Sequence, residues 1–84
     1  MPQSLDKAIQ ESVLESQKGA KAIAIAVGKS YSTLMREINP CDTGAKLGVG
    51  TFMDIIKTTG DVRPLELLTA ELGYRLISVE EATS

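Results

Sequence analysis

The apolar residues of the chain recur at helical spacing along most of its length. Near the N-terminus, Leu5, Ile9 and Val13 lie four positions apart, and polar or charged residues fill most positions between them. This pattern predicts an amphipathic helix from Leu5 to about Gln17, with Ser4 as its N-cap. One face of the helix is expected to be buried.

Two shorter helices are predicted next, separated by a glycine. The first covers residues 19–27, and Gly28 follows it directly, where a left-handed backbone conformation can end a helix and turn the chain. Ser30 is suited to cap the second helix, which runs through Asn39 until Pro40 stops it. The apolar faces are formed by Ile23, Ala24 and Val27 in the first helix and by Tyr31, Leu34 and Ile38 in the second.

A glycine-rich loop over residues 41–50 precedes two further predicted helices. One covers residues 51–59, and Asp61 starts the other, which ends at Gly73 and carries a proline in its first turn. Residues 74–79 are apolar at Leu76, Ile77 and Val79, and this pattern does not decide between strand, helical extension and tail. The residues expected to be buried are Phe52, Met53 and Ile56 in the fourth helix and Leu65, Leu68 and Leu72 in the fifth.

Length and composition fit one small helical domain. The chain has 84 residues, of which 43% are hydrophobic and 24% charged, an ordinary globular composition. We expect an all-α fold, a compact bundle of about five short helices of the lambda-repressor-like type. Residues 1–73 form the domain, and residues 74–84 are a short extension, either an oligomerisation segment or a tail.

The composition argues against catalysis and against a metal or cofactor site. There is no histidine, and Cys41 is the single cysteine, so neither a disulfide nor a cysteine–histidine metal site can be built. The Asp42-Thr43-Gly44 triplet resembles an aspartic-protease signature, but a second carboxylate and a β-rich scaffold are missing. The longest apolar stretch, residues 22–28, is too short to span a bilayer, and no signal sequence is apparent. We therefore expect a cytoplasmic protein that is not an enzyme and has no membrane partner.

The charge is unevenly distributed. The net charge is −2, yet residues 16–36 contain four cations and no acid. The two ends of the chain are acidic. A basic stretch that coincides with two helices around a glycine is typical of a helix-turn-helix, which binds double-stranded DNA through its second helix.

The predicted second helix of this motif presents a polar face that suits a major groove. Arg36 is placed to bond guanine, with Ser32 and Thr33 as weaker base contacts. Simpler roles remain open: Arg36 as an ion-pair partner of Glu37 or Glu11, Lys21 as a solubilising charge, Ser30 as a cap alone, Met35 as core, and Ile25 as either packed or exposed. The predicted DNA-binding residues are Lys21, Lys29, Ser30, Tyr31, Ser32, Thr33, Arg36, Asn39 and Lys46.

The stretch from Ala20 to Gly73 resembles the phage regulatory protein CII family of helix-turn-helix regulators. That resemblance implies an all-α DNA-binding domain, assembly into oligomers and control of a lysogeny promoter. Two features depart from the family pattern: Lys29 replaces the usual apolar residue, and the chain is short, so any separate oligomerisation region is missing or reduced to residues 74–84. The resemblance is carried by Ala24, Val27, Gly28, Ser30, Thr33, Leu34, Ile38, Asn39, Pro40, Leu47, Gly48, Val49, Thr59, Gly60, Asp61, Leu68, Ala70, Glu71, Leu72 and Gly73.

Two functions compete at this point. The first is a sequence-specific transcriptional regulator of phage or prophage type, which reads the major groove with helix 30–39 as a homodimer or higher oligomer, because one helix contacts too few base pairs to be selective. The second is a protein-interaction module, such as an anti-repressor or adaptor, on a helix-turn-helix-like fold. The net negative charge and the apolar Leu76 and Ile77 favour the second.

Overall fold

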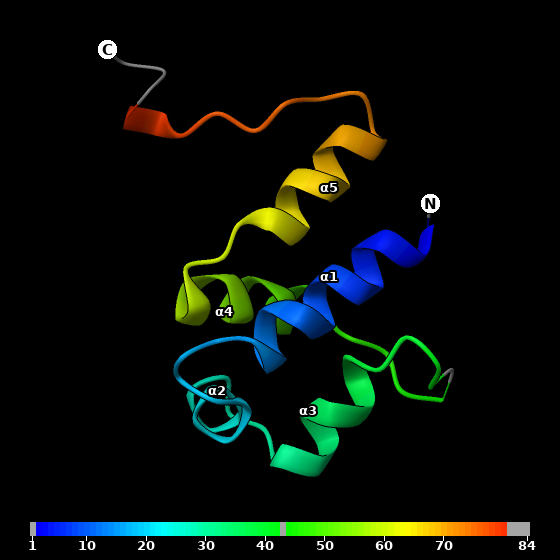
Figure 1. Cartoon of the computed structure of the whole chain (residues 1–84), viewed down its shortest axis with the longest axis vertical. Helices are drawn as coiled ribbons and strands as arrows, with labels where there is room; N and C mark the ends of the chain where they lie inside the picture. The colour runs from blue at the N-terminus through cyan, green and yellow to red at the C-terminus, as the bar shows by residue number, and fades with distance from the viewer. Residues whose placement is uncertain (1, 43, 81–84) are drawn as a thin grey trace.

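The computed structural model describes residues 2–42 and 44–80, with side chains from residue 5 onward. Within these ranges the chain forms helices and contains no strand, so the predicted all-α class is confirmed (Figure 1). The helices are α1 (Pro2–Leu14), α2 (Ala20–Ala26), α3 (Tyr31–Glu37), α4 (Val49–Thr59) and α5 (Arg63–Glu71).

Helix α1 crosses the middle of the molecule and organises the others. It contacts α2, α4 and α5, and α2 in turn contacts α3 and α4 (Figure 1). Burial of aliphatic side chains where these helices meet supplies the main stabilisation of the fold. The core consists of Ile9, Val13, Ile23, Ala24, Leu34, Ile38 and Ile55.

Both predicted ends of the first helix were wrong. The helix begins at Pro2, so Ser4 lies inside it, and proline is well tolerated in a first helical turn. It ends at Leu14 instead of about Gln17. Ser16 terminates it locally, because its hydroxyl accepts the Lys18 N–H at 3.2 Å and its carbonyl accepts the next N–H, which forms a turn.

The face that helix α4 buries matches the predicted one only in part. It begins at Val49, two residues earlier than expected, and Ile55 is its fully buried residue. Phe52 is half-buried against the core, whereas Met53 is exposed. Because α4 packs against both α1 and α2, its buried stripe is displaced from Met53 towards Ile55, and Ile56 is half-buried.

Helix α5 packs against α1 and projects from the rest of the molecule (Figure 1). Pro64 is buried in its first turn, but Leu72 is exposed, contrary to the prediction. Beyond α5 the chain continues without regular structure until residue 79. One N–H bond, from Tyr74 to the Thr69 carbonyl at 2.8 Å, ties the start of this segment to α5.

A polar contact joins the α4–α5 connection to α1. Asp61 lies two residues before α5 and accepts the Arg63 N–H at 3.1 Å, so it supports the first turn without being helical itself. The buried Ser12 hydroxyl lies 2.9 Å from the Ala8 carbonyl and 3.0 Å from Asp61 Oδ2, and its single hydrogen is shared between these acceptors. Arg63 Nη2 lies 2.7 Å from the same carboxylate, and hydrogen bonds from Arg63 hold the pKa of Asp61 well below its usual range.

Candidate nucleic-acid interface

Helices α2 and α3 pack against each other across a tight turn. Gly28 has φ +76°, the left-handed conformation predicted for this position. The Lys29 N–H bonds the Ala24 carbonyl at 2.9 Å, which closes the end of α2 in the manner of a Schellman motif. A side chain at position 28 would be strained by this backbone conformation, because left-handed φ values favour glycine.

Ser30 caps α3 as predicted. Its hydroxyl accepts the Thr33 N–H at 3.2 Å and donates to Thr33 Oγ1 at 2.8 Å. The cap satisfies one of the N–H groups that the first turn of a helix leaves without a partner. It also fixes the Thr33 hydroxyl, so the start of α3 presents a fixed group of hydroxyls to solvent.

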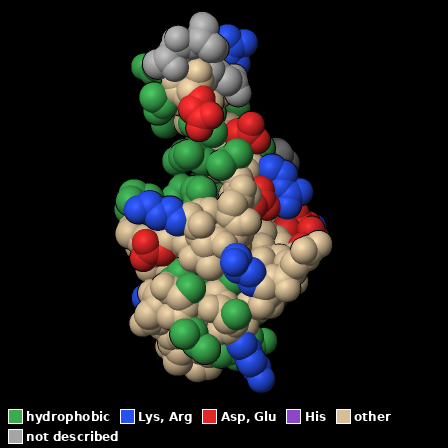
Figure 2. Space-filling view, turned by 90° about the vertical axis from the view of Figure 1, so that its left-hand side faces the viewer, with side chains coloured by type: hydrophobic (Ala, Val, Ile, Leu, Met, Phe, Trp, Pro, Cys, Tyr) green, Lys and Arg blue, Asp and Glu red, His purple; other side chains and the backbone are tan. Residues whose placement is uncertain are grey.

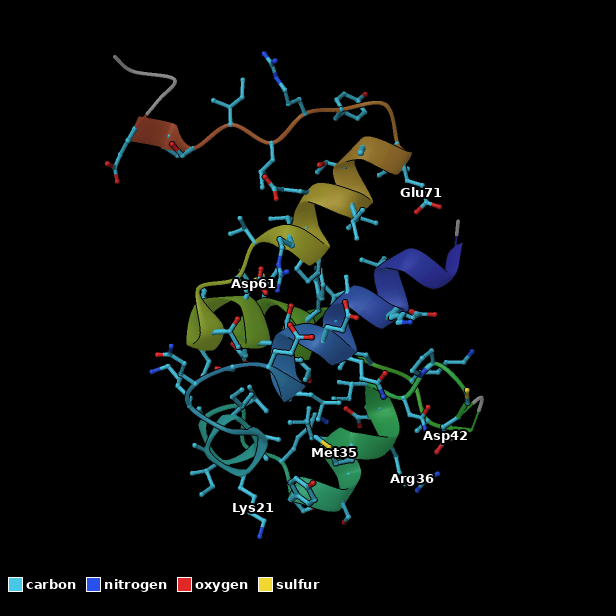
Figure 3. All side chains as sticks on the ribbon, in the orientation of Figure 1. Lys21, Met35, Arg36, Asp42, Asp61 and Glu71 are labelled. Atoms are coloured by element: carbon cyan, nitrogen blue, oxygen red, sulfur yellow. The ribbon has the colours of Figure 1, made fainter. Side chains whose placement is uncertain are left out.

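The two faces of α3 differ sharply in exposure. Leu34 and Ile38 are buried, as predicted, and Met35 is half-buried against the core. Ser32, Thr33 and Arg36 are exposed. Helix α3 lies at the lower end of the molecule in Figure 3, and Arg36 points away from the body. The anchored apolar side leaves a polar side open to a partner.

Arg36 makes an ion pair that sequence reasoning missed. Its Nε lies 3.2 Å from Asp42 Oδ2, so its partner is neither Glu37 nor Glu11. Asp42 also accepts the Gly44 N–H at 2.9 Å, and the hydrogen bond from Arg36 lowers the pKa of Asp42. The Asp-x-Gly spacing, typical of a turn in which the carboxylate bonds a nearby N–H, was the available signal. Asp42 therefore orients Arg36 from the α3–α4 loop.

Two lysines lie near α3 in different ways. Lys29 is half-buried, and its Nζ lies 3.2 Å from Glu37 Oε2. Its charge is therefore paired with a carboxylate at the end of α3. Lys21 is exposed, and its Nζ lies 5.7 Å from the centre of the Tyr31 ring, within range of a cation–π interaction. Lys21 and Tyr31 thus bring charge and a phenol together where α2 and α3 meet.

Asn39 and Lys46 lie apart from that group. Asn39 Oδ1 accepts the Cys41 N–H at 2.9 Å, which shapes the loop after α3. Lys46 is exposed and lines, together with Asn39, a groove of about 470 Å³ beside the start of α1. The structure therefore places seven of the predicted residues on α2, the turn and α3, and two on the loop behind them.

No three His, Cys, Asp or Glu side chains within the described residues are placed to hold a metal ion. None of the helices in the described part of the chain is both long and apolar enough to cross a bilayer.

Comparison with known proteins assigns the chain to a class of phage regulators. The family model for phage regulatory protein CII (CP76) matches residues 3–84, which is nearly the whole sequence. The chain therefore belongs to the phage regulatory protein CII family. The match extends past Gly73, so residues 74–84 are part of the family pattern. Neither the curated proteins nor the solved structures include a match to it.

Proposed function

We propose that this protein is a sequence-specific DNA-binding transcriptional regulator in which α2 and α3 act as a helix-turn-helix. The observation that carries the proposal is the two-sided character of α3. Its apolar side is anchored by buried Leu34 and Ile38, and its exposed side carries Ser32, Thr33 and Arg36. A helix held in this way can enter a major groove without loss of core packing.

Arg36 is the principal base-reading residue in this proposal. Asp42 bonds only the Nε edge of the guanidinium, and the terminal nitrogens make no hydrogen bond with the described residues. They are free to donate to guanine O6 and N7, the commonest specific contact in major grooves. Because Asp42 already holds the Arg36 side chain, Arg36 loses less rotamer entropy when it binds DNA. The carboxylate of Asp42 also offsets part of the positive charge of Arg36.

Ser32 and Thr33 make weaker base contacts in this proposal, and the other predicted residues contact the DNA backbone. Lys21 and Tyr31 lie together beside the start of α3, where a phosphate would approach. Ser30 donates to a phosphate only if its bond to Thr33 Oγ1 is exchanged, and Lys29 only if Glu37 releases it. Asn39 and Lys46 approach the duplex from the loop side. Such phosphate contacts fix the register of the protein on DNA and carry no sequence information themselves.

A homodimer or higher oligomer is part of the proposal. One short helix contacts too few base pairs for selectivity, so two copies on adjacent half-sites are required. The basic stretch over residues 16–36 faces the duplex in this proposal, and α5, with its two glutamates, lies at the other end of the molecule (Figure 1). This arrangement reconciles a net charge of −2 with a DNA partner.

The test begins with selection of binding sites from random double-stranded DNA, followed by fluorescence anisotropy with the selected site. Arg36→Ala is compared with Arg63→Ala as a matched control. Both arginine side chains are 64% exposed and both pair with an aspartate, but Arg63 lies on α5. Arg36→Ala should weaken specific binding by about 1 to 3 kcal/mol and relax preference at one base pair, whereas Arg63→Ala should keep the preference.

Salt dependence completes the test. Affinity for the selected site should fall steeply as salt rises, because neutralised phosphates release counterions. Equal losses in the two arginine variants, or no enrichment of any site, would overturn the proposal. The protein-interaction module is then favoured by the exposed Ile77 beyond α5.

A further inference from the structure

The groove that Asn39 and Lys46 line lies where several segments of the chain come together. Its walls are formed by the start of α1, the end of α3, the α3–α4 loop, the start of α4 and Leu68 of α5. Its volume of about 470 Å³ is within the range of roughly 300 to 1,000 Å³ that is typical of small-molecule sites. A concave space bounded by so many segments suits a compact ligand better than a flat protein surface.

Much of the lining of the groove is apolar. Leu5, Leu47 and Phe52 line it and are only half-buried, although each packs against the core. Figure 2 shows the side of the molecule away from the α3–α4 loop, where hydrophobic side chains over the lower part lie in small separate groups. Such separate groups are normal in soluble proteins, whereas the apolar residues of the groove line one cavity. A ligand with an apolar body would remove their exposed area from water.

The charged side chains of the groove are mostly acidic. Among the described residues that line it, Asp6, Glu37 and Asp42 are acidic and Lys46 is basic. The groove therefore has a net negative charge, unlike the basic stretch over residues 16–36. This charge disfavours an anionic ligand and favours a cationic one.

Glu37 supplies an acceptor that has no donor. Its Oε2 lies 3.2 Å from Lys29 Nζ, but its Oε1 is buried and accepts no hydrogen bond from the residues that the structure describes. Buried polar atoms in folded proteins nearly always have a partner, and an unpaired one costs free energy. An N–H group of a ligand that reaches Oε1 would supply the missing bond.

We propose that the groove binds a small organic cation with an apolar body. The apolar part packs against Leu47 and Phe52, and the charged N–H groups donate to the carboxylates of the groove. An aromatic amidine has the required chemistry, because it combines a flat apolar ring with a planar fork of N–H donors. Such a fork forms two parallel hydrogen bonds with a carboxylate, the geometry that makes arginine–carboxylate pairs strong.

Asp42 connects the groove to the proposed reading helix, and this part of the inference rests on the function proposed above. Asp42 Oδ2 accepts from Arg36 Nε at 3.2 Å, and the same side chain lines the groove (Figure 3). A cation that donates to Asp42 competes with Arg36 for this carboxylate. Arg36 then loses the partner that orients it, so a ligand in the groove should lower the selectivity of DNA binding.

The first test is NMR of the isotope-labelled full chain with benzamidine and without DNA. Changes in chemical shift should be concentrated at the groove, including the amides of Leu47 and Phe52, and should extend to the Nε–H signal of Arg36. We expect a dissociation constant of about 1 mM, because a ligand this small buries few atoms. Benzamide has the same shape without the charge, and it should bind about tenfold more weakly or not at all.

Asp6→Asn tests the charge of the groove at an exposed residue, where the fold should tolerate the change. It should weaken benzamidine binding by about threefold to tenfold, because the cation loses a carboxylate. Asp54→Asn is the matched control: Asp54 is exposed on α4 outside the groove lining, so this variant should bind like the wild type. Circular dichroism checks that both variants are folded.

Equal binding of benzamide and benzamidine, or equal losses in the two aspartate variants, would overturn the proposal. So would a groove that leaves benzamidine unbound but takes up an arginine-rich peptide. These measurements contain no DNA, so their failure refutes only the ligand site, and a protein that binds benzamidine but no DNA refutes only the regulator.

A second measurement tests the connection to Arg36. With the selected DNA site, saturating benzamidine should lower the ratio of specific to non-specific affinity several-fold. Benzamide at the same ionic strength should leave this ratio unchanged, which separates the effect from the general weakening of DNA binding by salt. Benzamidine bound in the groove with an unchanged ratio would refute the competition for Asp42.

Discussion

Two isoleucines on α2 give a sharp test of the fold that supports the proposed interface. Ile23 is 0% exposed and Ile25 is 79% exposed, although they are two positions apart on one helix. Ile23 packs in the core with Leu34 of α3, so it helps to hold the proposed reading helix in place. Replacement of each by alanine is the same chemical change in two environments.

The expected effects differ in size and in sign. Ile23→Ala removes three buried carbon atoms at about 0.8 kcal/mol each, or about 2.4 kcal/mol. A cavity term brings the loss to about 3 kcal/mol, within the range of roughly 2 to 5 kcal/mol for such changes. Ile25→Ala loses little buried area and gains a few tenths of a kcal/mol from the higher helix propensity of alanine. It should be neutral or slightly stabilising.

Urea denaturation followed by circular dichroism measures both variants. A small domain has a total free energy of unfolding of about 5 to 15 kcal/mol, so a loss of about 3 kcal/mol is a large share of it. With an m-value of about 1 kcal/mol/M, the midpoint for Ile23→Ala should fall by about 3 M. Equal destabilisation in the two variants, or a loss of more than about 1 kcal/mol in Ile25→Ala, would refute the helix packing described here.

Two further predictions concern polar contacts. Ser30→Ala should lower the free energy of unfolding by about 1 kcal/mol, because the Thr33 N–H loses its cap. Ser32 is exposed, so Ser32→Ala should change the free energy of unfolding little. Urea titrations that rank the two variants the other way would contradict the capping role of Ser30. Asp61 has a pKa below the usual value of about 3.9, so its contribution to stability is fully present above about pH 4 and is lost as the pH falls below it. Thermal melts from pH 6 downward should show a steeper acid loss in the wild type than in Asp61→Asn, and parallel curves would exclude the Ser12–Asp61–Arg63 contact as its source.

The sequence by itself determined the class and much of the local structure. Apolar periodicity predicted five helices, because each helix must bury one stripe of its surface. Gly28 and Ser30 marked the turn between α2 and α3, since their effects depend on backbone conformation and on bonds within a few residues. The family resemblance rested on the same local residues and is confirmed by the family match.

Only the tertiary structure decided which stripe each later helix buries and which charges pair. Ile55 replaces Met53 in the core because α4 meets two helices at once, and periodicity does not show where neighbours lie. The bonds from Arg36 to Asp42 and from Ser12 to Asp61 join residues six and 49 positions apart. Such pairs depend on how the loops and helices pack in space, and a single sequence does not show which distant residues come close together.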